Sequence, residues 1–282
     1  MKEKIGGGGK NQPYDEQNGQ YENEKATTKA LTTKEKLEQA KRIYGDDYEK
    51  EKNNTILTNK KSINSKLKDQ QALTDEEIEE VIISISETYI SSSRGKEDKN
   101  LKRILESNGF SKTPKKVKKE ELVQVLSKGK VLYRGLNGDD AVKYKEQFYQ
   151  GDLFVGTGFG GNGVYMSIDV NESNNYTKGS NVVACAIMPS DFKIAGKEIR
   201  KEYQTYYDKM FQKYKYQKTN SKQENEKNSL IMKTLSFGAY CALKGYDGYL
   251  PTIKPEINMV ILNRGKLVIG EHYEQERIME LD

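Results

Sequence analysis

The chain has 282 residues, of which 34% are hydrophobic and 32% charged, and its 47 basic against 42 acidic residues give a formal net charge of +5. So low an apolar share indicates that much of the chain is solvated helix or loop rather than core. The small excess of positive charge permits an anionic ligand or a nucleic acid without requiring either.

Four features of the sequence predict a soluble, cytoplasmic protein without a metal site. The first residues, MKEKIGGGGKNQPYDEQ, have no apolar run after the basic start, and the longest apolar runs, VVACAIM and MVIL, are too short to cross a bilayer. Two cysteines, Cys185 and Cys241, lie among small or apolar neighbours and are expected to be buried free thiols. The only histidine, His272, has no other histidine or paired cysteine near it, so neither a zinc site nor a Ser-His-Asp triad is expected.

The N-terminal part of the chain is expected to be partly disordered and otherwise helical. Residues 1–31 have the Gly, Asn, Gln, Glu and Lys content of a disordered tail, and a capping box at Thr32 to Glu35 begins an exposed helical connector over 32–73. A second capping box at Thr74 to Glu77 opens a helical lobe over 74–130. The apolar stripe that follows at helical spacing is Ile78, Val81, Ile82, Ile85 and Tyr89, and two further helices are predicted at KNLKRILESN and KKEELVQVLSKG, the second ending at Gly129.

From 131 to 282 the pattern changes to that of a β-rich core. Strands are predicted at KVLYRGL, GVYMS, NVVACAIMP, EINMVILN and KLVIG, and helices at DDAVKYKEQFYQ, KEIRKEYQTYYDKMFQKY and NSLIMKTLSFGAYCALKG. The polar stretch from Lys213 to Asn228 is expected to be an insertion loop, and the tyrosines before it to form a half-buried helix face rather than a grip on a polynucleotide. The order of elements predicts an α+β domain with a helical N-terminal lobe.

The stretch GTGFGGNGVYMS contains G-x-G-x-x-G at Gly156, Gly158 and Gly161, which is the fingerprint of a dinucleotide-binding Rossmann unit. A Rossmann loop must lead directly into a helix, whose N-terminal amides meet the pyrophosphate. Here the residues from Val164 to Ile168 follow, and they are strand-like. The Rossmann interpretation therefore fails.

Three separated segments resemble the diphtheria-toxin-like ADP-ribosyltransferase superfamily, which includes poly(ADP-ribose) polymerases, bacterial toxins and phage-encoded domains. Tyr133-Arg134-Gly135 is similar to the first motif of the family, Gly163 to Ser167 followed by Tyr176 to the second, and the strand from Glu256 to Leu262 falls where the third belongs. The resemblance covers about Thr74 to Ile269. It implies a split antiparallel β-sheet core and NAD as co-substrate.

The resemblance implies a role for each matched residue. Arg134 corresponds to the arginine that makes forked hydrogen bonds to NAD, with Tyr133 and Gly135 beside it, Gly135 letting the ligand approach the backbone. Tyr165 corresponds to the tyrosine that stacks on nicotinamide, preceded by Gly163. Ser167 would bond the ligand or the catalytic acid, and Tyr176 would close or pack the far side of the pocket.

The third motif departs from the family pattern of a glutamate on this strand. Counting back from the turn at Asn263-Arg264 places Asn258 where the catalytic glutamate is expected, and Glu256 two residues earlier on the same face. Glu256 is favoured as the catalytic acid in a shifted register, while the alternatives are a weaker activity supported by Asn258 or a loss of catalysis. Asp247 is a second carboxylate candidate, although Asp before Gly is typical of a turn.

The function expected on this basis is NAD-dependent mono-ADP-ribosylation of a macromolecular acceptor, a protein rather than a nucleic acid, by a toxin, a phage effector or a regulatory modifier. No membrane partner is expected. One alternative is a non-catalytic structural or binding module of the phage morphogenesis type, which Asn258 and the long charged N-terminus favour. The other is an RNA 2′-phosphotransferase, a branch that uses histidines in its motifs, whereas this chain has only His272.

Overall fold

The computed structural model of the protein describes residues 47–92, 96–111, 113–150, 155–158, 161–215 and 221–271, with the side chains of 47–56 and of Thr157 excepted. The chain divides into two compact units, Met1–Thr55 and Ile56–Asp282, and the first is described only where helix α2 begins. The tail expected over 1–31, the capping box at Thr32 and the histidine His272 lie outside the described residues.

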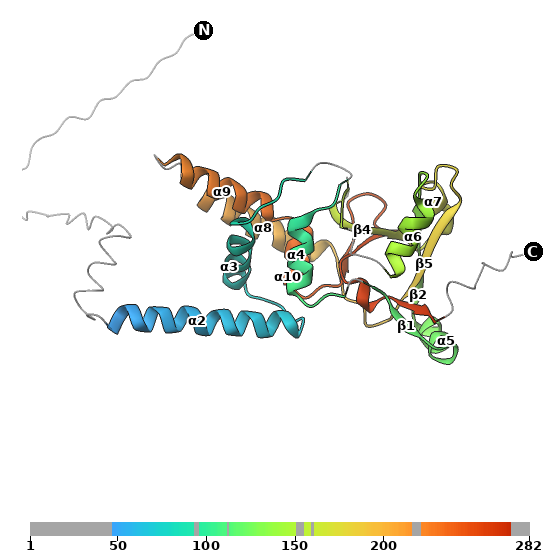
Figure 1. Ribbon diagram of the computed structural model, residues 1–282, viewed down its shortest axis with the longest axis horizontal. Helices are drawn as coiled ribbons and strands as arrows, with labels where there is room; N and C mark the ends of the chain where they lie inside the picture. The colour runs from blue at the N-terminus through green and yellow to red at the C-terminus, as the bar shows by residue number, and fades with distance from the viewer. Residues whose placement is uncertain are drawn as a thin grey trace, which may run out of the picture. The chain divides into compact units, whose positions relative to one another are not determined.

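The described residues form an α+β domain, as predicted (Figure 1). The helices are α2 (Asp47–Lys68), α3 (Asp75–Ser86), α4 (Lys99–Ser107), α5 (Lys119–Lys128), α6 (Ala141–Tyr149), α7 (Val170–Asn174), α8 (Lys197–Tyr214), α9 (Lys222–Thr234), α10 (Phe237–Leu243) and the short 3-10 helix η1 (Arg264–Lys266). The strands are β1 (Lys115–Val117), β2 (Lys130–Leu136), β3 (Gly156–Gly158), β4 (Gly161–Ser167), β5 (Val182–Met188), β6 (Ile194–Ala195), β7 (Gly248–Tyr249), β8 (Asn258–Ile261) and β9 (Val268–Gly270). None of the helices in these residues is both long enough and apolar enough to span a membrane.

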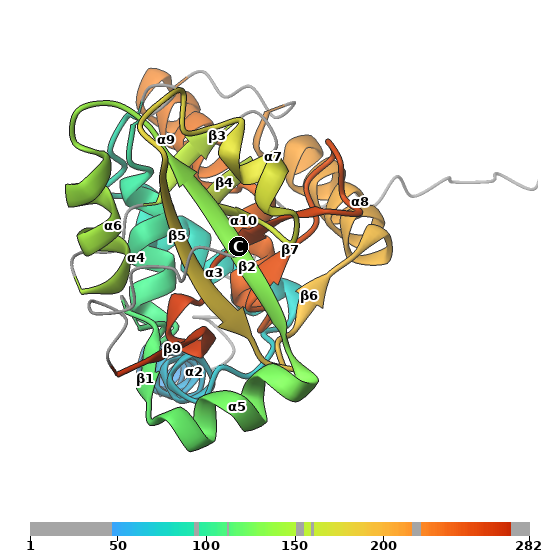
Figure 2. The same ribbon diagram turned by 90° about the vertical axis from the view of Figure 1, so that its right-hand side faces the viewer.

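The strands form one mixed sheet in the order β1-β9-β5-β2-β4-β8-β7-β6, with β3 paired to β4. The inner strands are antiparallel, as expected, but β1 pairs with β9 and β6 with β7 in parallel, so the sheet is not antiparallel throughout. β2 and β5 pair along their whole length and lie side by side in Figure 2. β2 and β4, in contrast, share the single pair Tyr133↔Ser167, so the two halves of the sheet are joined at one point.

Two clusters of buried side chains cover opposite faces of the sheet. Strand β8 contributes to both, because its consecutive side chains point to opposite faces. Met259 and Ile261 belong to a cluster with β2, β4, β5 and α6, whereas Val260 belongs to a cluster with the helices α3, α4, α8, α9 and α10. In Figure 1 these helices gather on one side of the domain. Alternate residues of β8 therefore pack on opposite faces, which is why NMVIL is an unbroken apolar run.

The helix predicted after Thr74 is confirmed, including its capping box. Glu77 N donates to Thr74 Oγ1 over 3.3 Å, and Thr74 N donates to Glu77 Oε2 over 2.9 Å. Ile78 and Ile82 are fully buried. Gly129 ends helix α5 as expected, although in an extended rather than a left-handed conformation. Helix α3 thus begins at its predicted residue because local capping and burial agree.

Three local expectations are wrong. The stretch from Lys213 to Asn228 is not an insertion loop, because α8 continues to Tyr214 and α9 begins at Lys222, after Ser221 accepts a hydrogen bond from Glu224 N. Cys185 is exposed, since it faces the side of β5 opposite its buried neighbours, while Cys241 is buried. The connector over 32–73 is not exposed throughout, because it contains the buried apolar side chains Ile63, Leu67 and Leu73.

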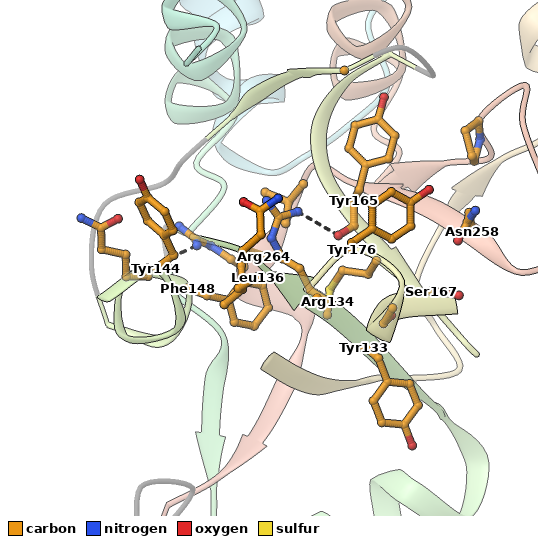
Figure 3. A pocket seen from close by; sticks show the side chains of 18 of the residues that line it. Tyr133, Arg134, Leu136, Tyr144, Phe148, Tyr165, Ser167, Tyr176, Asn258 and Arg264 are labelled. Atoms are coloured by element: carbon orange, nitrogen blue, oxygen red, sulfur yellow. Dashed lines mark hydrogen bonds between the residues drawn. The ribbon is translucent and has the colours of Figure 1, made fainter. Parts of the chain in front are cut away.

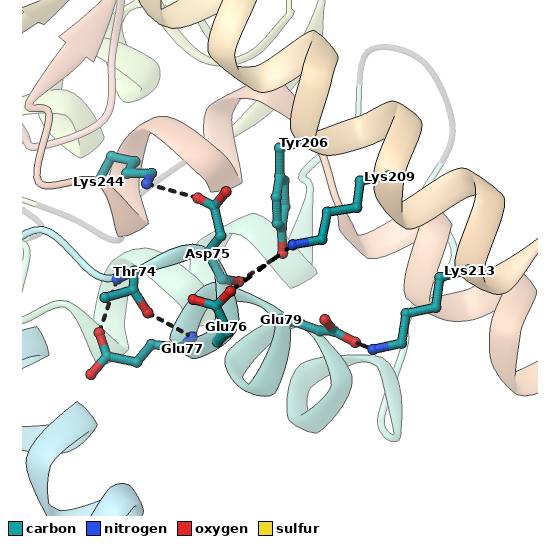
Figure 4. A network of polar contacts seen from close by, with 9 residues as sticks. All are labelled: Thr74, Asp75, Glu76, Glu77, Glu79, Tyr206, Lys209, Lys213 and Lys244. Carbon is teal, nitrogen blue, oxygen red and sulfur yellow. Dashed lines mark hydrogen bonds and ion pairs between the residues drawn. The ribbon is translucent and has the colours of Figure 1, made fainter. Parts of the chain in front are cut away.

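A polar network joins helix α3 to α8 and to the residue after α10 (Figure 4). Lys244 Nζ lies 2.9 Å from Asp75 Oδ1, and Tyr206 donates to the Asp75 carbonyl over 3.2 Å. Lys209 lies 3.9 Å from Glu76, and both of those side chains are largely exposed. The tyrosine face of α8 expected from the sequence is confirmed, with Tyr206 buried and its hydroxyl bonded.

Replacing Lys244 by methionine is expected to lower the free energy of unfolding by about 0.5 to 1 kcal/mol, because its ion pair is partly shielded from solvent. The same replacement at Lys209 is expected to have no measurable effect, because its longer ion pair is exposed. Urea unfolding of both variants measures the difference. Equal losses of unfolding free energy in the two variants would contradict a stabilising role for the shielded pair of Lys244 and Asp75.

Candidate functional site

A pocket of about 540 Å³ opens where β2 and β4 separate, beyond their single shared pair (Figure 3). This volume lies within the range of small-molecule sites. Its walls come from the second half of β2, from β4, from helices α6 and α7, and from the turn before β8. The lining residues include Arg134, Tyr165, Ser173, Tyr176, Asn258 and Arg264.

Arg134 lies in the opening of the sheet. Its Nη1 donates to the carbonyl oxygen of Tyr165 on β4 over 2.8 Å, in a region where the ladder between the two strands is not formed. Among the described residues no carboxylate pairs with it, and burial lowers its pKa to about 10. The guanidinium therefore remains charged at neutral pH, while the one acceptor that the described part of the chain provides for it is a neutral carbonyl. This arrangement favours an anionic ligand.

A second guanidinium, that of Arg264, lines the pocket from η1. Its side chain is 2% exposed, its Nη1 donates to the Gln147 carbonyl over 3.4 Å, and it lies 5.5 Å from the Phe148 ring. None of the described lining residues is Asp or Glu. Sequence reasoning missed Arg264, because an arginine between Asn263 and Gly265 has the pattern of an exposed turn.

The glycine-rich stretch forms a β-hairpin and not a Rossmann loop. β3 pairs with β4 from Gly156↔Gly163 to Gly158↔Gly161, and a strand follows the glycines, as the sequence indicated. A Cβ atom at Gly158 would lie 2.4 Å from the Tyr165 ring, and one at Gly163 would lie 2.3 Å from Val260. The glycines thus make room for the neighbouring side chains, and Gly158, unlike Gly163, also lines the pocket.

Gly135 is needed for packing within the protein. A Cβ atom there would lie 1.9 Å from the Ser173 carbonyl oxygen, so the backbone of α7 occupies the space that was expected for a ligand. Ser173 and Tyr176, at the end of this helix and just after it, line the pocket. Close packing of β2 on α7 therefore sets one wall of the pocket.

The remaining residues of the first and second motifs also line the pocket, but their contacts differ from the roles that the family resemblance implied. Tyr165 donates its hydroxyl to the Gly161 carbonyl, which fixes its ring, while its backbone carbonyl accepts from Arg134 (Figure 3). Ser167 is 3% exposed and its hydroxyl bonds the Ile257 carbonyl and the Asp169 amide, so it ties β4 to the turn before β8. Tyr176 is 56% exposed at the mouth, and the Tyr133 ring points away from Arg134 (Figure 3).

The third strand brings Asn258 to the pocket and not Glu256. Asn258 begins β8, pairs with Ser167 and lines the pocket. The expectation that Glu256 lies on this strand is wrong, because it is exposed in the preceding turn. Lys254 adopts a φ of +48°, and its carbonyl accepts from both Ile257 N and Asn258 N, which bends the chain there.

Asp247, the other carboxylate candidate, is buried away from the pocket. Its Oδ2 accepts from Lys193 N over 2.9 Å and its Oδ1 from Asn263 Nδ2 over 2.8 Å, while Lys266 lies 3.2 Å away. These bonds hold β6, β7 and η1 together. In the described residues no group of three or more His, Cys, Asp or Glu side chains is placed to hold a metal ion.

Glu172 on α7, which the sequence reasoning did not single out, is a buried acid next to the lining residue Ser173. It is 7% exposed, and Lys254 Nζ donates to its Oε2 over 2.6 Å. Hydrogen bonds from Lys254 and, less strongly, from Asn258 and Asn175 hold the pKa of Glu172 below its ordinary value, against the opposing effect of burial.

Replacing Glu172 by glutamine is expected to destabilise the protein at pH 7 and to have less effect below pH 4.5, the ordinary value of the carboxyl group. Because the folded-state pKa is lowered, the ionised carboxylate stabilises the fold above its unfolded pKa, and this contribution is lost as the pH falls through the folded pKa. Urea unfolding of the variant and the wild type at pH 7 and pH 4 measures the loss in the free energy of unfolding. Glu256→Gln is the control, because Glu256 is exposed. Its free energy of unfolding is expected to change by less than about 0.5 kcal/mol at both pH values. A destabilisation by Glu172→Gln that does not depend on pH would contradict the assignment.

Comparison with known proteins gives no assignment, because no family model, no curated protein and no solved structure matches the chain.

Proposed function

We propose that the protein is an NAD-dependent ADP-ribosyltransferase with an ADP-ribosyltransferase-type split sheet, and that the pocket between β2 and β4 is its NAD site. Four observations support this proposal. The three strands that carry the family-like motifs are neighbours in the order β2-β4-β8, and the sheet opens between the first two. The pocket lies in that opening, and two arginines and several aromatic rings line it.

The chemistry assigns roles to these residues. When the bond between ribose C1′ and the nicotinamide nitrogen breaks, both electrons stay on nicotinamide, which leaves neutral, and positive charge develops on the ribose. The acceptor nucleophile then bonds C1′ and loses its proton to water. Arg134 and Arg264 bind the anionic pyrophosphate, Tyr165 stacks on the nicotinamide ring, and Asn258 faces the ribose.

The observation that carries the proposal is the unpaired state of Arg134 among the described residues. A guanidinium that is partly buried, bonded to a backbone carbonyl and directed into a pocket without described acids is costly for the free protein. An anionic ligand offsets that cost by supplying the missing charge. Without such a ligand, the cost of burial gives no reason for the protein to keep an arginine at position 134.

A macromolecular acceptor is supported by the mouth of the pocket. Tyr144, Tyr176 and Ile253 line the pocket and are 43%, 56% and 48% exposed. Large apolar side chains left in solvent around a cavity are typical of a surface that contacts another molecule. We infer that a protein acceptor binds across this rim.

A second candidate is a nucleotide-binding module without catalysis, and Asn258 favours it. Asn258 takes the third-strand position in the pocket, and its amide is neutral. Without a negative charge opposite the developing cation the rate would fall by on the order of a hundredfold or more. Such a module would bind NAD and leave it intact.

The full-length protein is tested with NAD in three assays: calorimetric binding, release of nicotinamide, and transfer of label from labelled NAD to proteins of a lysate. Transfer that is absent in Arg134→Ala and present in Arg103→Ala supports the transferase; Arg103 lies outside the pocket and donates to the Thr88 carbonyl. Binding without nicotinamide release identifies the non-catalytic module. Absence of binding, release and transfer would refute both candidates.

A further inference from the structure

Arg264 reaches the pocket from a turn that has little structure of its own. It is the first residue of η1, a 3-10 helix of three residues. The backbone bonds of this turn include a long one, of 3.4 Å, from Lys266 N to the Asn263 carbonyl. Because the hydrogen bonds of short 3-10 helices have poor geometry, they hold such a turn only weakly. The position of Arg264 therefore depends on contacts between η1 and the rest of the domain.

Asp247 bonds the residues on both sides of Arg264. Its Oδ1 accepts from Asn263 Nδ2 over 2.8 Å, and Lys266 Nζ lies 3.2 Å from its Oδ2. The Asp247 carbonyl also accepts from Asn263 N over 2.8 Å. Asn263 is the N-cap residue of η1 but does not cap it with its side chain, whose amide bonds Asp247 instead. One aspartate thus holds the residue before Arg264 and the last residue of the turn.

Asp247 is itself fixed to the sheet. Its Oδ2 accepts from Lys193 N and its own backbone nitrogen donates to the Lys193 carbonyl, both over 2.9 Å, and the residue is 2% exposed. Next to Arg264, a Cβ atom at Gly265 would lie only 2.3 Å from Ser111 Cβ, so η1 also packs closely on that residue. Neither Asp247 nor Ser111 is among the lining residues. Contacts outside the pocket therefore hold the turn that carries Arg264.

A carboxylate suits position 247 because three donors converge on it. They are the backbone nitrogen of Lys193, the side-chain amide of Asn263 and the ammonium group of Lys266. An ionised carboxylate only accepts hydrogen bonds and can serve all three. An asparagine has the same size but one acceptor oxygen, so its NH2 group would face a donor. Asp247→Asn is therefore expected to loosen the turn without changing its volume.

The position of the turn determines where the guanidinium of Arg264 lies. Its Nη1 donates to the Gln147 carbonyl over 3.4 Å, which is long for such a bond, and the group lies 5.5 Å from the Phe148 ring (Figure 3). A guanidinium binds a phosphate strongly when its forked donors match two oxygens. A displacement of about 1 Å, caused far from the reacting atoms, can cost about 100-fold.

We propose that Asp247 is a positioning residue of the pocket, which fixes the turn around Arg264 so that its guanidinium binds the pyrophosphate group of NAD. This inference rests on the proposed function. Asp247 acts through Asn263 and η1 and not by contact with the ligand. A purely structural role predicts a different pattern, in which Asp247 joins β6, β7 and η1 and any effect on binding is independent of Arg264.

The experiment is a double-mutant cycle on the full-length protein, with calorimetric binding of NAD and of inorganic pyrophosphate as readouts. Asp247→Asn is expected to weaken both ligands about 10-fold or more, as for outer residues that orient a ligand-contacting group. The factor is expected to be the same for both ligands, because they share the diphosphate group. In the Arg264→Met background, Asp247→Asn is expected to cause no further loss, because it acts through Arg264.

Two further variants separate positioning from stability. Asn100→Ala is the matched control, because Asn100 is 4% exposed and bonds the Ile90 backbone outside the pocket. It is expected to lower Tm and to leave the affinity for both ligands unchanged. The exchange of Asp247→Asn with Asn263→Asp restores a donor and a carboxylate in reversed order, with an oxygen left for Lys193 N. It is expected to recover part of the affinity that Asp247→Asn loses.

Unchanged affinity in Asp247→Asn, a loss for NAD alone, or a loss that persists in the Arg264→Met background would overturn the inference, while NAD binding by the wild type leaves the proposed function intact. If Asp247→Asn does not fold, the cycle is run with Asn263→Ala, which removes the bond to Asp247 Oδ1 and leaves the carboxylate with Lys193 and Lys266. A wild type that binds neither ligand would overturn this inference together with the proposed function. A wild type that binds pyrophosphate but not NAD would contradict the proposed function alone.

Discussion

Replacing Arg134 by methionine is expected to weaken NAD binding by at least about 100-fold while leaving the free protein as stable as the wild type, or up to about 2 kcal/mol more stable. The loss of affinity follows from the charge-assisted hydrogen bonds, each worth about 1.5 to 3 kcal/mol. The gain in stability follows from burial, because the guanidinium is bonded only to the Tyr165 carbonyl among the described residues. Replacing a buried charge by an apolar side chain of similar size is often neutral or stabilising.

Calorimetry with NAD and thermal unfolding of the free protein measure both effects. Arg103→Met is the control, because Arg103 donates to a backbone carbonyl in the same way but lies on α4, outside the pocket. Arg134→Lys separates charge from geometry, since lysine keeps the charge without the forked donor arrangement, and it is expected to bind NAD about tenfold or more weakly than the wild type. A large loss of stability in Arg134→Met with unchanged affinity would show that Arg134 is a structural residue and that the ligand binds elsewhere.

The inner strands and the first motif were predictable from the sequence, because their signals are local. The β-branched and aromatic residues of KVLYRGL and GVYMS predicted β2 and β4. The resemblance of these segments to the first two family motifs predicted that Arg134 and Tyr165 share a site, and both line the pocket. The short strands β1, β6 and β7 were not predicted. They have two or three residues each and depend on partners distant in sequence, such as Lys115↔Val268.

The charged residues of the site were less predictable, because their positions depend on turns. Counting back from Asn263 predicted that Asn258 and Glu256 both lie on the third strand. Asn258 does, but Glu256 does not, since the chain bends at Lys254 before the strand begins. Glu172 lies in the polar segment NESNN, which has the composition of a solvent-exposed turn, yet tertiary packing buries it. Buried charges of this kind are determined by tertiary contacts and not by local pattern.

The same dependence on tertiary packing gives the largest expected effect on stability, that of Gly135→Ala. The new Cβ atom would lie 1.9 Å from the Ser173 carbonyl oxygen and 2.9 Å from its carbon, and both are backbone atoms that cannot move aside by a side-chain rotation. Either β2 or α7 must shift, so we expect a loss of about 3 kcal/mol in the free energy of unfolding, at the upper end for overpacked sites. For a domain of this size that corresponds to a decrease in Tm of about 6 to 12 °C.

Gly196→Ala is the matched control, because its Cβ would meet only the end of the Glu198 side chain, at 3.4 Å, and it is expected to cost less than about 1 kcal/mol. A shift of α7 also displaces Ser173, which lines the pocket, so Gly135→Ala is expected to weaken NAD binding even where the protein remains folded. Thermal unfolding and calorimetry on the two variants measure these effects. A Gly135→Ala protein with wild-type stability and weakened binding would instead indicate that the ligand, and not α7, requires the glycine.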